Sequence, residues 1–111
     1  MEVRYLSEKE EENYQNIKYL RKKHGEIMAK SIQNRISQIE SLDSVGVLLD
    51  TKIGKAHMLD HEYKYHIGLN LTGNYRLIIK PVYEEHTDFS ELNLHTIFIV
   101  TIMEVKDYHG K

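Results

Sequence analysis

Residues 57–81 read HMLDHEYKYHIGLNLTGNYRLIIKP, and this stretch has the pattern of a β-hairpin. Apolar side chains occupy alternate positions in its first half, and this period of two predicts a half-buried strand over residues 63–71. Gly73 and Asn74 tolerate the positive φ of a tight turn. Residues 75–80 predict a second strand, which ends at Pro81 because proline has no amide hydrogen to donate to a neighbouring strand.

Arg76 lies in the second strand of this hairpin. Side chains alternate between the two faces of a strand, so Arg76 and Lys80 share one face with Ile78 between them. The apolar residues on either side of Arg76 then point to the opposite face, toward the core. The sequence therefore predicts a cationic side chain on the uncovered face of the sheet.

Two helices are predicted ahead of the hairpin. Ser7 and Glu10 have the spacing of a capping box, and the helix that begins there ends at His24 and Gly25. A second helix follows directly, because apolar residues recur at steps of three and four: Met28, Ile32, Ile36, Ile39 and Leu42. The short connection predicts an αα-hairpin. Residues 2–6 alternate weakly and predict a short edge strand.

The remaining segments complete the expected fold. Residues 43–56 read as a connector, residues 82–94 as a solvated acidic loop, and residues 95–105 (HTIFIVTIMEV) as a central strand. This order predicts an α+β fold, with an N-terminal helical hairpin packed on one face of a small antiparallel sheet of three to five strands. A chain of 111 residues that is 41% hydrophobic is expected to form a single domain over residues 1–111.

The composition excludes several classes of function. The chain has no cysteine, which excludes disulfides, thiolate metal sites and a cysteine nucleophile. It has neither a membrane-spanning apolar window nor a signal-peptide pattern, so we expect a cytoplasmic protein with no membrane partner. The formal net charge of −2 counts against a broad nucleic-acid-binding surface, although the hairpin itself is locally basic.

Three polar groups are candidates for a catalytic site. They are the histidines at the hairpin entry (His57, His61 and His66), Arg76, and the terminal triplet Asp107, Tyr108 and His109. Cleavage of RNA by transesterification needs a base for the 2′-hydroxyl, an acid for the leaving 5′-oxygen and a cation for the charge that develops on the phosphorane. Histidine suits either proton step, arginine suits the phosphate, and a tyrosine ring can stack on an unpaired base.

Each candidate also has a plain structural interpretation. An arginine on a strand is by default a surface ion-pair member, and a terminal histidine is often frayed. His57 and His61 could form a metal pair only within a helix, and this segment is predicted to enter a strand. Neither a metal nor another cofactor is expected.

Several of these segments together resemble the HigB-type toxins of the RelE/ParE superfamily. The matching residues are Leu20 to Gly25 (LRKKHG), Met28-Ala29, Asn34 to Ile36, Gly54 to Leu59 (GKAHML), Asn74 to Pro81 (NYRLIIKP) and Glu104 to His109 (EVKDYH). The resemblance implies the RelE-like α+β fold. It also implies a toxin that cleaves mRNA on the ribosome without a metal and thereby inhibits translation. The partner implied is a cognate antitoxin with a helix-turn-helix domain, through which the toxin reaches DNA only indirectly.

The resemblance also implies roles for individual residues. Arg76 corresponds to the phosphate-contacting arginine, His57 to the histidine of the "H.L" motif, and Asp107, Tyr108 and His109 to the terminal catalytic group. One position departs from the pattern, because Asp60 stands where relatives usually have lysine. We therefore expect other cations to contact the RNA, namely His61, Lys64 and Lys80.

Two alternatives remain open at the level of sequence. The first is a member of the superfamily that is not a nuclease, either a ParE-like gyrase inhibitor or an inactive relative that still binds an antitoxin. Asp60 favours this alternative, whereas the terminal Asp-Tyr-His favours the nuclease. The second is an interaction domain with another partner, which would be preferred if Arg76 and His109 lay far apart.

Overall fold

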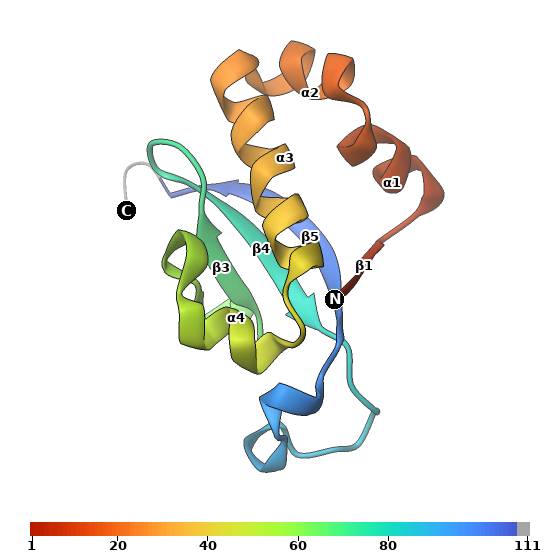
Figure 1. Ribbon diagram of the computed structural model, residues 1–111, viewed down its shortest axis with the longest axis vertical. Coiled ribbons are helices and arrows are strands. Elements are labelled where there is room, and N and C mark those ends of the chain that lie inside the picture. The colour runs from red at the N-terminus through yellow and green to blue at the C-terminus, as the bar shows by residue number, and fades with distance from the viewer. Residues whose placement is uncertain (109–111) are drawn as a thin grey trace.

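The computed structural model describes residues 1–108, which fold into a five-stranded sheet with helices on one side (Figure 1). The helices are α1 (Glu8–Gln15), α2 (Ile17–His24), α3 (Glu26–Ser41) and α4 (Val45–Thr51). The strands are β1 (Glu2–Tyr5), β2 (His57–Met58), β3 (Ile67–Asn70), β4 (Tyr75–Pro81) and β5 (Ile99–Asp107). Short 3-10 turns occupy Ile53–Lys55, His61–Tyr63, Phe89–Glu91 and Leu94–Thr96.

The sheet is mixed, with strand order β1-β5-β4-β3-β2. The pairs from β2 through β5 are antiparallel, as expected, and the predicted α+β fold is confirmed. The sheet differs from the prediction at one edge, where β1 runs parallel to β5. Parallel pairing is possible there because the whole helical region lies between the two strands in sequence and supplies the long crossover that parallel strands need.

Helix α3 supplies most of the core from the helical side. Its buried residues are Met28, Ala29, Ile32, Ile36 and Ile39, and these are at the steps of three and four that predicted the helix. They form one cluster with the sheet residues Ile67, Leu69, Leu77, Ile79, Val100 and Ile102. Figure 1 shows α3 crossing this face of the sheet. Each fully buried isoleucine or leucine stabilises the fold by about 1.5–3 kcal/mol.

A single arginine links α3 to the sheet. The Arg35 Nε donates a 2.7 Å hydrogen bond to the backbone oxygen of Asn70, and its Nη1 donates to Gln38 at 2.8 Å. Gly54 lies directly beneath the guanidinium, with φ of 60°, and a Cβ at that position would come within 2.6 Å of the Arg35 Nε. The glycine is thus required both by its backbone conformation and by the close approach of Arg35.

The helix predicted from Ser7 to His24 is two helices. Ser7 caps α1 as predicted, accepting from the Glu10 amide at 3.1 Å. Asn16 then interrupts the helix, because its side chain accepts from the amides of Lys18 and Tyr19 and starts α2. An asparagine that competes for backbone amides in this way favours a helix start over a helix interior. The predicted αα-hairpin is therefore formed by α2 and α3.

The strand predicted over residues 63–71 is much shorter than its alternating pattern indicated. Only Ile67–Asn70 form β3, while His61–Tyr63 form a 3-10 turn. His61 and Tyr65 both have positive φ, 59° and 68°, which no regular strand allows. The second predicted strand is confirmed as β4, and Gly73, with φ of 57°, lies in the turn that precedes it.

The last strand begins later than predicted, at Ile99, because Leu94–Thr96 form a 3-10 turn. The predicted acidic loop is confirmed as irregular, but it is held by aromatic contacts. The Phe89 ring stacks on Tyr65 with centroids 4.6 Å apart and meets Tyr83 edge-on at 5.5 Å. Within residues 1–108, none of the helices combines the length and hydropathy that a bilayer crossing requires.

Candidate nucleic-acid interface

The sheet face opposite the helices, here called the open face, carries the polar side chains of β4 and β5. Because Leu77 and Ile79 point into the core, pleat geometry places Arg76, Ile78 and Lys80 on the open face. Their partners across the ladder are Lys106, Glu104 and Thr101. All three partners fall on the open face because the register shifts by one residue between Ile78 and Ile79, which leaves an extra residue in β5.

Arg76 and Tyr108 are in direct contact on this face. The guanidinium carbon of Arg76 lies 4.6 Å from the centroid of the Tyr108 ring, and Lys106 is the ladder partner of Arg76. The Tyr108 amide donates a 3.0 Å hydrogen bond to the backbone oxygen of Asn74, which continues the pairing beyond the end of β5. Two cations and an aromatic ring are thus held together at one end of the sheet, a combination that suits phosphate and an unpaired base.

The segment from Leu59 to His66 folds over the middle of the open face. A Cβ on Gly68 would lie 3.1 Å from Leu59, so the leucine covers this glycine of β3. Tyr63 donates a 2.9 Å hydrogen bond to the Glu104 carboxylate, and the Lys106 ammonium lies 5.8 Å from the Tyr63 ring centroid. Partial desolvation and the hydrogen bond to Glu104 raise the pKa of Tyr63 to about 12. Tyr63 is therefore a neutral donor near neutral pH.

A cleft of about 280 Å³ lies between this segment and β5. It is lined by residues 59–63, Lys106 and Tyr108. His61 and Asp60 line this cleft from the loop side. Asp60 is the residue that departs from the HigB-type pattern. The wall formed by residues 60–62 thus carries two carboxylates and an imidazole, and the opposite wall carries a cation and an aromatic ring.

Three of the candidate residues predicted from sequence lie at this end of the open face. Arg76 and Tyr108 are in contact, and His61 lines the neighbouring cleft with Tyr108. Lys64 follows on the same loop, with its ammonium 5.1 Å from the Tyr65 ring centroid. Lys80 lies on the same face at the opposite end of β4, paired with Thr101.

The other predicted catalytic residues are placed differently. His57 is in the edge strand β2, with β3 between it and β4, and its Nδ1 lies 2.9 Å from the Lys55 oxygen. Two strand spacings separate it laterally from β4, about 10 Å. Asp107 pairs with Tyr75, so its side chain emerges on the face opposite to Arg76. Asp107 is thus not on the face that carries Arg76 and Tyr108. His109 lies outside the described residues.

The sequence interpretation missed three residues of the site: Tyr63, Glu104 and Lys106. Glu104, Lys106 and Tyr108 are spaced by two in the last strand, and this period alone places them on one face. No comparable signal identifies Tyr63, whose position depends on a turn between residues with positive φ. Among residues 1–108, no group of three or more histidine, aspartate or glutamate side chains is placed to hold a metal ion.

These features define a class of protein: a small α+β domain with basic and aromatic side chains on its open face. No family model matches the sequence, and no curated protein matches it either. Among solved structures, the chain is similar to the YoeB/ParE toxin from Agrobacterium tumefaciens, with a TM-score of 0.54 and 10% sequence identity. The match covers 98% of this chain and 100% of that one. The two proteins therefore share a fold over their whole lengths.

Proposed function

We propose that this protein is the toxin of a toxin-antitoxin system and that it cleaves mRNA on the ribosome without a metal. The observation that carries this proposal is the contact between Arg76 and Tyr108 beside Lys106, on the open face of a fold shared with a YoeB/ParE toxin. Two motifs that resemble HigB-type toxins fall on the same elements, since Tyr75 to Pro81 of the first forms β4 and Glu104 to Asp107 of the second ends β5.

The proposed reaction is a transesterification within the RNA strand. The 2′-oxygen attacks the adjacent phosphorus and loses its proton, and the bond to the 5′-oxygen breaks as that oxygen gains a proton. Arg76, assisted by Lys106, stabilises the negative charge on the phosphorane oxygens, and a guanidinium can do so bidentately. Tyr108 stacks on a base beside the cut. His109 and His61, which lines the cleft, are proposed for the proton transfers. His57, two strands from β4, is proposed to contact the RNA rather than the reacting oxygens.

An antitoxin is the proposed protein partner. The resemblance implies a helix-turn-helix domain in that antitoxin, so the toxin would approach DNA only through it. Asp107 belongs to the terminal group by resemblance, but its position on the far side of β5 suits a supporting role near the 73–75 turn better than direct contact with phosphate.

One observation favours a second candidate function. Asp60 and Glu62 line the cleft beside Lys106, and carboxylates repel phosphate. A relative that has lost nuclease activity, or one that inhibits gyrase as ParE-like toxins do, would tolerate these charges. Such a protein would need only its protein-binding surfaces.

Induced expression in bacteria separates the two candidates. Wild type is compared with Arg76→Ala and His109→Ala, and Arg21→Ala on the helical side serves as a matched control for the loss of an arginine. We expect growth arrest with new mRNA 5′ ends inside translated messages for wild type and the control, and neither effect for the two site variants. Arrest without cuts, or no arrest by soluble folded protein, would contradict the nuclease.

A further inference from the structure

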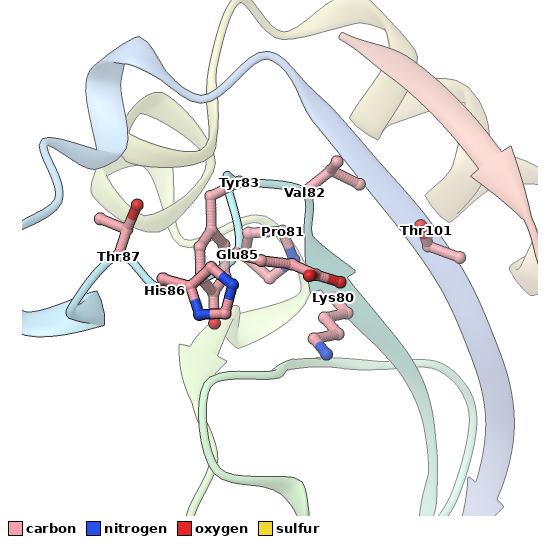
Figure 2. A pocket seen from close by; sticks show the side chains of 8 residues that line it. All are labelled: Lys80, Pro81, Val82, Tyr83, Glu85, His86, Thr87 and Thr101. Atoms are coloured by element: carbon pink, nitrogen blue, oxygen red, sulfur yellow. The ribbon is translucent and has the colours of Figure 1, made fainter.

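The open face ends in a groove at the Lys80 end of β4, about 13 Å from Arg76 at 3.3 Å per residue. The groove has a volume of about 520 Å³ and lies between β4, β5 and the segment that connects them. Figure 2 shows Lys80, Tyr83, Glu85 and His86 gathered around this hollow, with Thr101 on the neighbouring strand. None of these residues belongs to the cleft beside Tyr108.

The floor of the groove is cationic. Lys80 pairs with Thr101 across the β4–β5 ladder, and Thr101 pairs with Arg4 on its other side. Side chains of paired residues project from the same face, so a row of Arg4, Thr101 and Lys80 crosses three strands of the open face. Within residues 1–108, none of the ion pairs involves Lys80, and Arg4 is paired through its Nε to Glu2. The Lys80 ammonium and the Thr101 hydroxyl line the groove and are thus available to an anion, whereas Arg4 extends the row on β1 beyond the groove lining.

The wall of the groove is aromatic and rigid. Tyr83 lies against Phe89, which stacks in turn on Tyr65. His86 stands beside Tyr83 with φ of 70°, in the left-handed region that non-glycine residues seldom adopt. The two rings offer stacking surfaces. The exposed Glu85 carboxylate offers an acceptor for an amino group, and its negative charge lowers the affinity of the groove for phosphate.

We propose that this groove binds one nucleotide of the RNA strand that flanks the reactive phosphate. Lys80 and Thr101 hold its phosphate, Tyr83 and His86 stack on its base, and Glu85 accepts from an amino group of the base. The inference rests on the proposed function, because it assigns the path that the bound RNA strand follows along β4, away from the Arg76 site. The rise along one strand of a fully stacked duplex is about 3.4 Å per nucleotide, so the groove lies at most about four nucleotides from the cut, and fewer if the strand is extended.

Binding of labelled single-stranded RNA tests the groove directly. A stacked trinucleotide is too short to occupy both sites at once, whereas an octanucleotide spans both. Fluorescence anisotropy would compare wild type with Lys80→Ala and with His86→Asn, since asparagine tolerates the left-handed conformation but removes the ring. Lys30→Ala on α3 is the control for loss of one lysine. Circular dichroism melting would show that each variant is folded.

We expect the octanucleotide to bind wild type and the control alike, and to bind the two groove variants roughly ten- to a hundredfold more weakly. Trinucleotide binding should differ less between wild type and the groove variants, because a trinucleotide does not gain from both sites together. Lys80→Ala should also reduce the dependence of log affinity on log salt by about 0.7, the loss of one phosphate contact. His86→Asn should leave that slope unaltered.

The failures are distinguishable. Octanucleotide binding that is equal in wild type and both groove variants would overturn the inference and leave the proposed function standing. Binding of neither oligonucleotide to wild type would also overturn the inference, whereas the proposed function stands or falls on the mapping of mRNA 5′ ends in expressing bacteria.

Discussion

The Tyr63 hydroxyl donates a 2.9 Å hydrogen bond to the Glu104 carboxylate, 41 residues further along the chain. This bond ties the loop before β3 to the middle of β5, and the Tyr63 ring also faces the ammonium of Lys106. The loop that forms one wall of the candidate cleft is thus anchored to the strand that forms the other.

Alkaline pH should weaken the fold through this tyrosine. The pKa of Tyr63 is raised from 10 to about 12 in the folded protein, so between these values the folded state holds a proton that the unfolded state has lost. Its contribution to stability is complete below pH 10 and is lost as pH rises toward 12. Tyr63→Phe should make the decline over this window shallower, as measured by urea unfolding at a series of pH values.

Glu104→Gln is the matching change on the acceptor. Because the carboxylate charge contributes to the raised pKa of Tyr63, this variant should move tyrosinate formation in the native protein to lower pH. An absorbance titration with the same profile as wild type would contradict the assigned contact.

Replacement of Arg76 by lysine separates charge from geometry. Lysine keeps the positive charge, but it cannot hold two phosphate oxygens in the fixed fork of a guanidinium. We expect Arg76→Ala to lower ribosome-dependent cleavage of a reporter mRNA by about 100- to 1,000-fold, and Arg76→Lys to recover only part of this loss. Full activity of Arg76→Lys would show that charge alone suffices.

Asp60 should limit the affinity of the cleft for RNA. Asp60→Lys exchanges a negative for a positive charge beside Lys106, so we expect RNA binding to tighten by roughly fivefold at low salt. Asp43→Lys makes the same charge change at an exposed position after α3, and it controls for the change in net charge. The same improvement in both variants would indicate a nonspecific effect.

Gly54 and Gly73 form a matched pair for testing the link between α3 and the sheet. Both have positive φ, but a Cβ at Gly54 would meet the Arg35 guanidinium, whereas nothing lies within 4 Å of a Cβ at Gly73. We expect Gly73→Ala to cost about 1 kcal/mol from the backbone alone. Gly54→Ala should cost about 1–3 kcal/mol more, because Arg35 must move away from Asn70. Equal shifts of the urea midpoint would show that the Arg35 contact contributes little.

The elements predicted well from sequence are those in which the spacing of apolar residues indicates which side of the element is buried. The stripe in α3 and the alternation in β4 place the core and Arg76 correctly, because each depends only on which side of a helix or strand is covered. The last strand was recognised from its apolar run, and its charged positions could have been assigned from the same period of two.

The errors have local physical causes. The alternation over residues 63–66 is accidental, because the chain there turns through a positive φ at Tyr65 and Tyr63 is fixed by a partner distant in sequence. Helix α1 ends early because the Asn16 side chain takes the amides that would continue it. Asp107 and Arg76 are on opposite faces because side chains alternate along β5, so neighbours in the sequence of the terminal triplet need not share one face.

The parallel pairing of β1 with β5 has a consequence for synthesis of the chain. Strand β1 is synthesised first but cannot pair until β5 is made, since within residues 1–108 its ladder partner is β5, which begins at residue 99. Strand β4 also lacks its second neighbour until then, so the emerging chain carries unpaired strand edges while the helices can already form. Arg76 meets Lys106 and Tyr108 only when β5 is added. During synthesis the cationic cluster is therefore one of the last features of residues 1–108 to assemble.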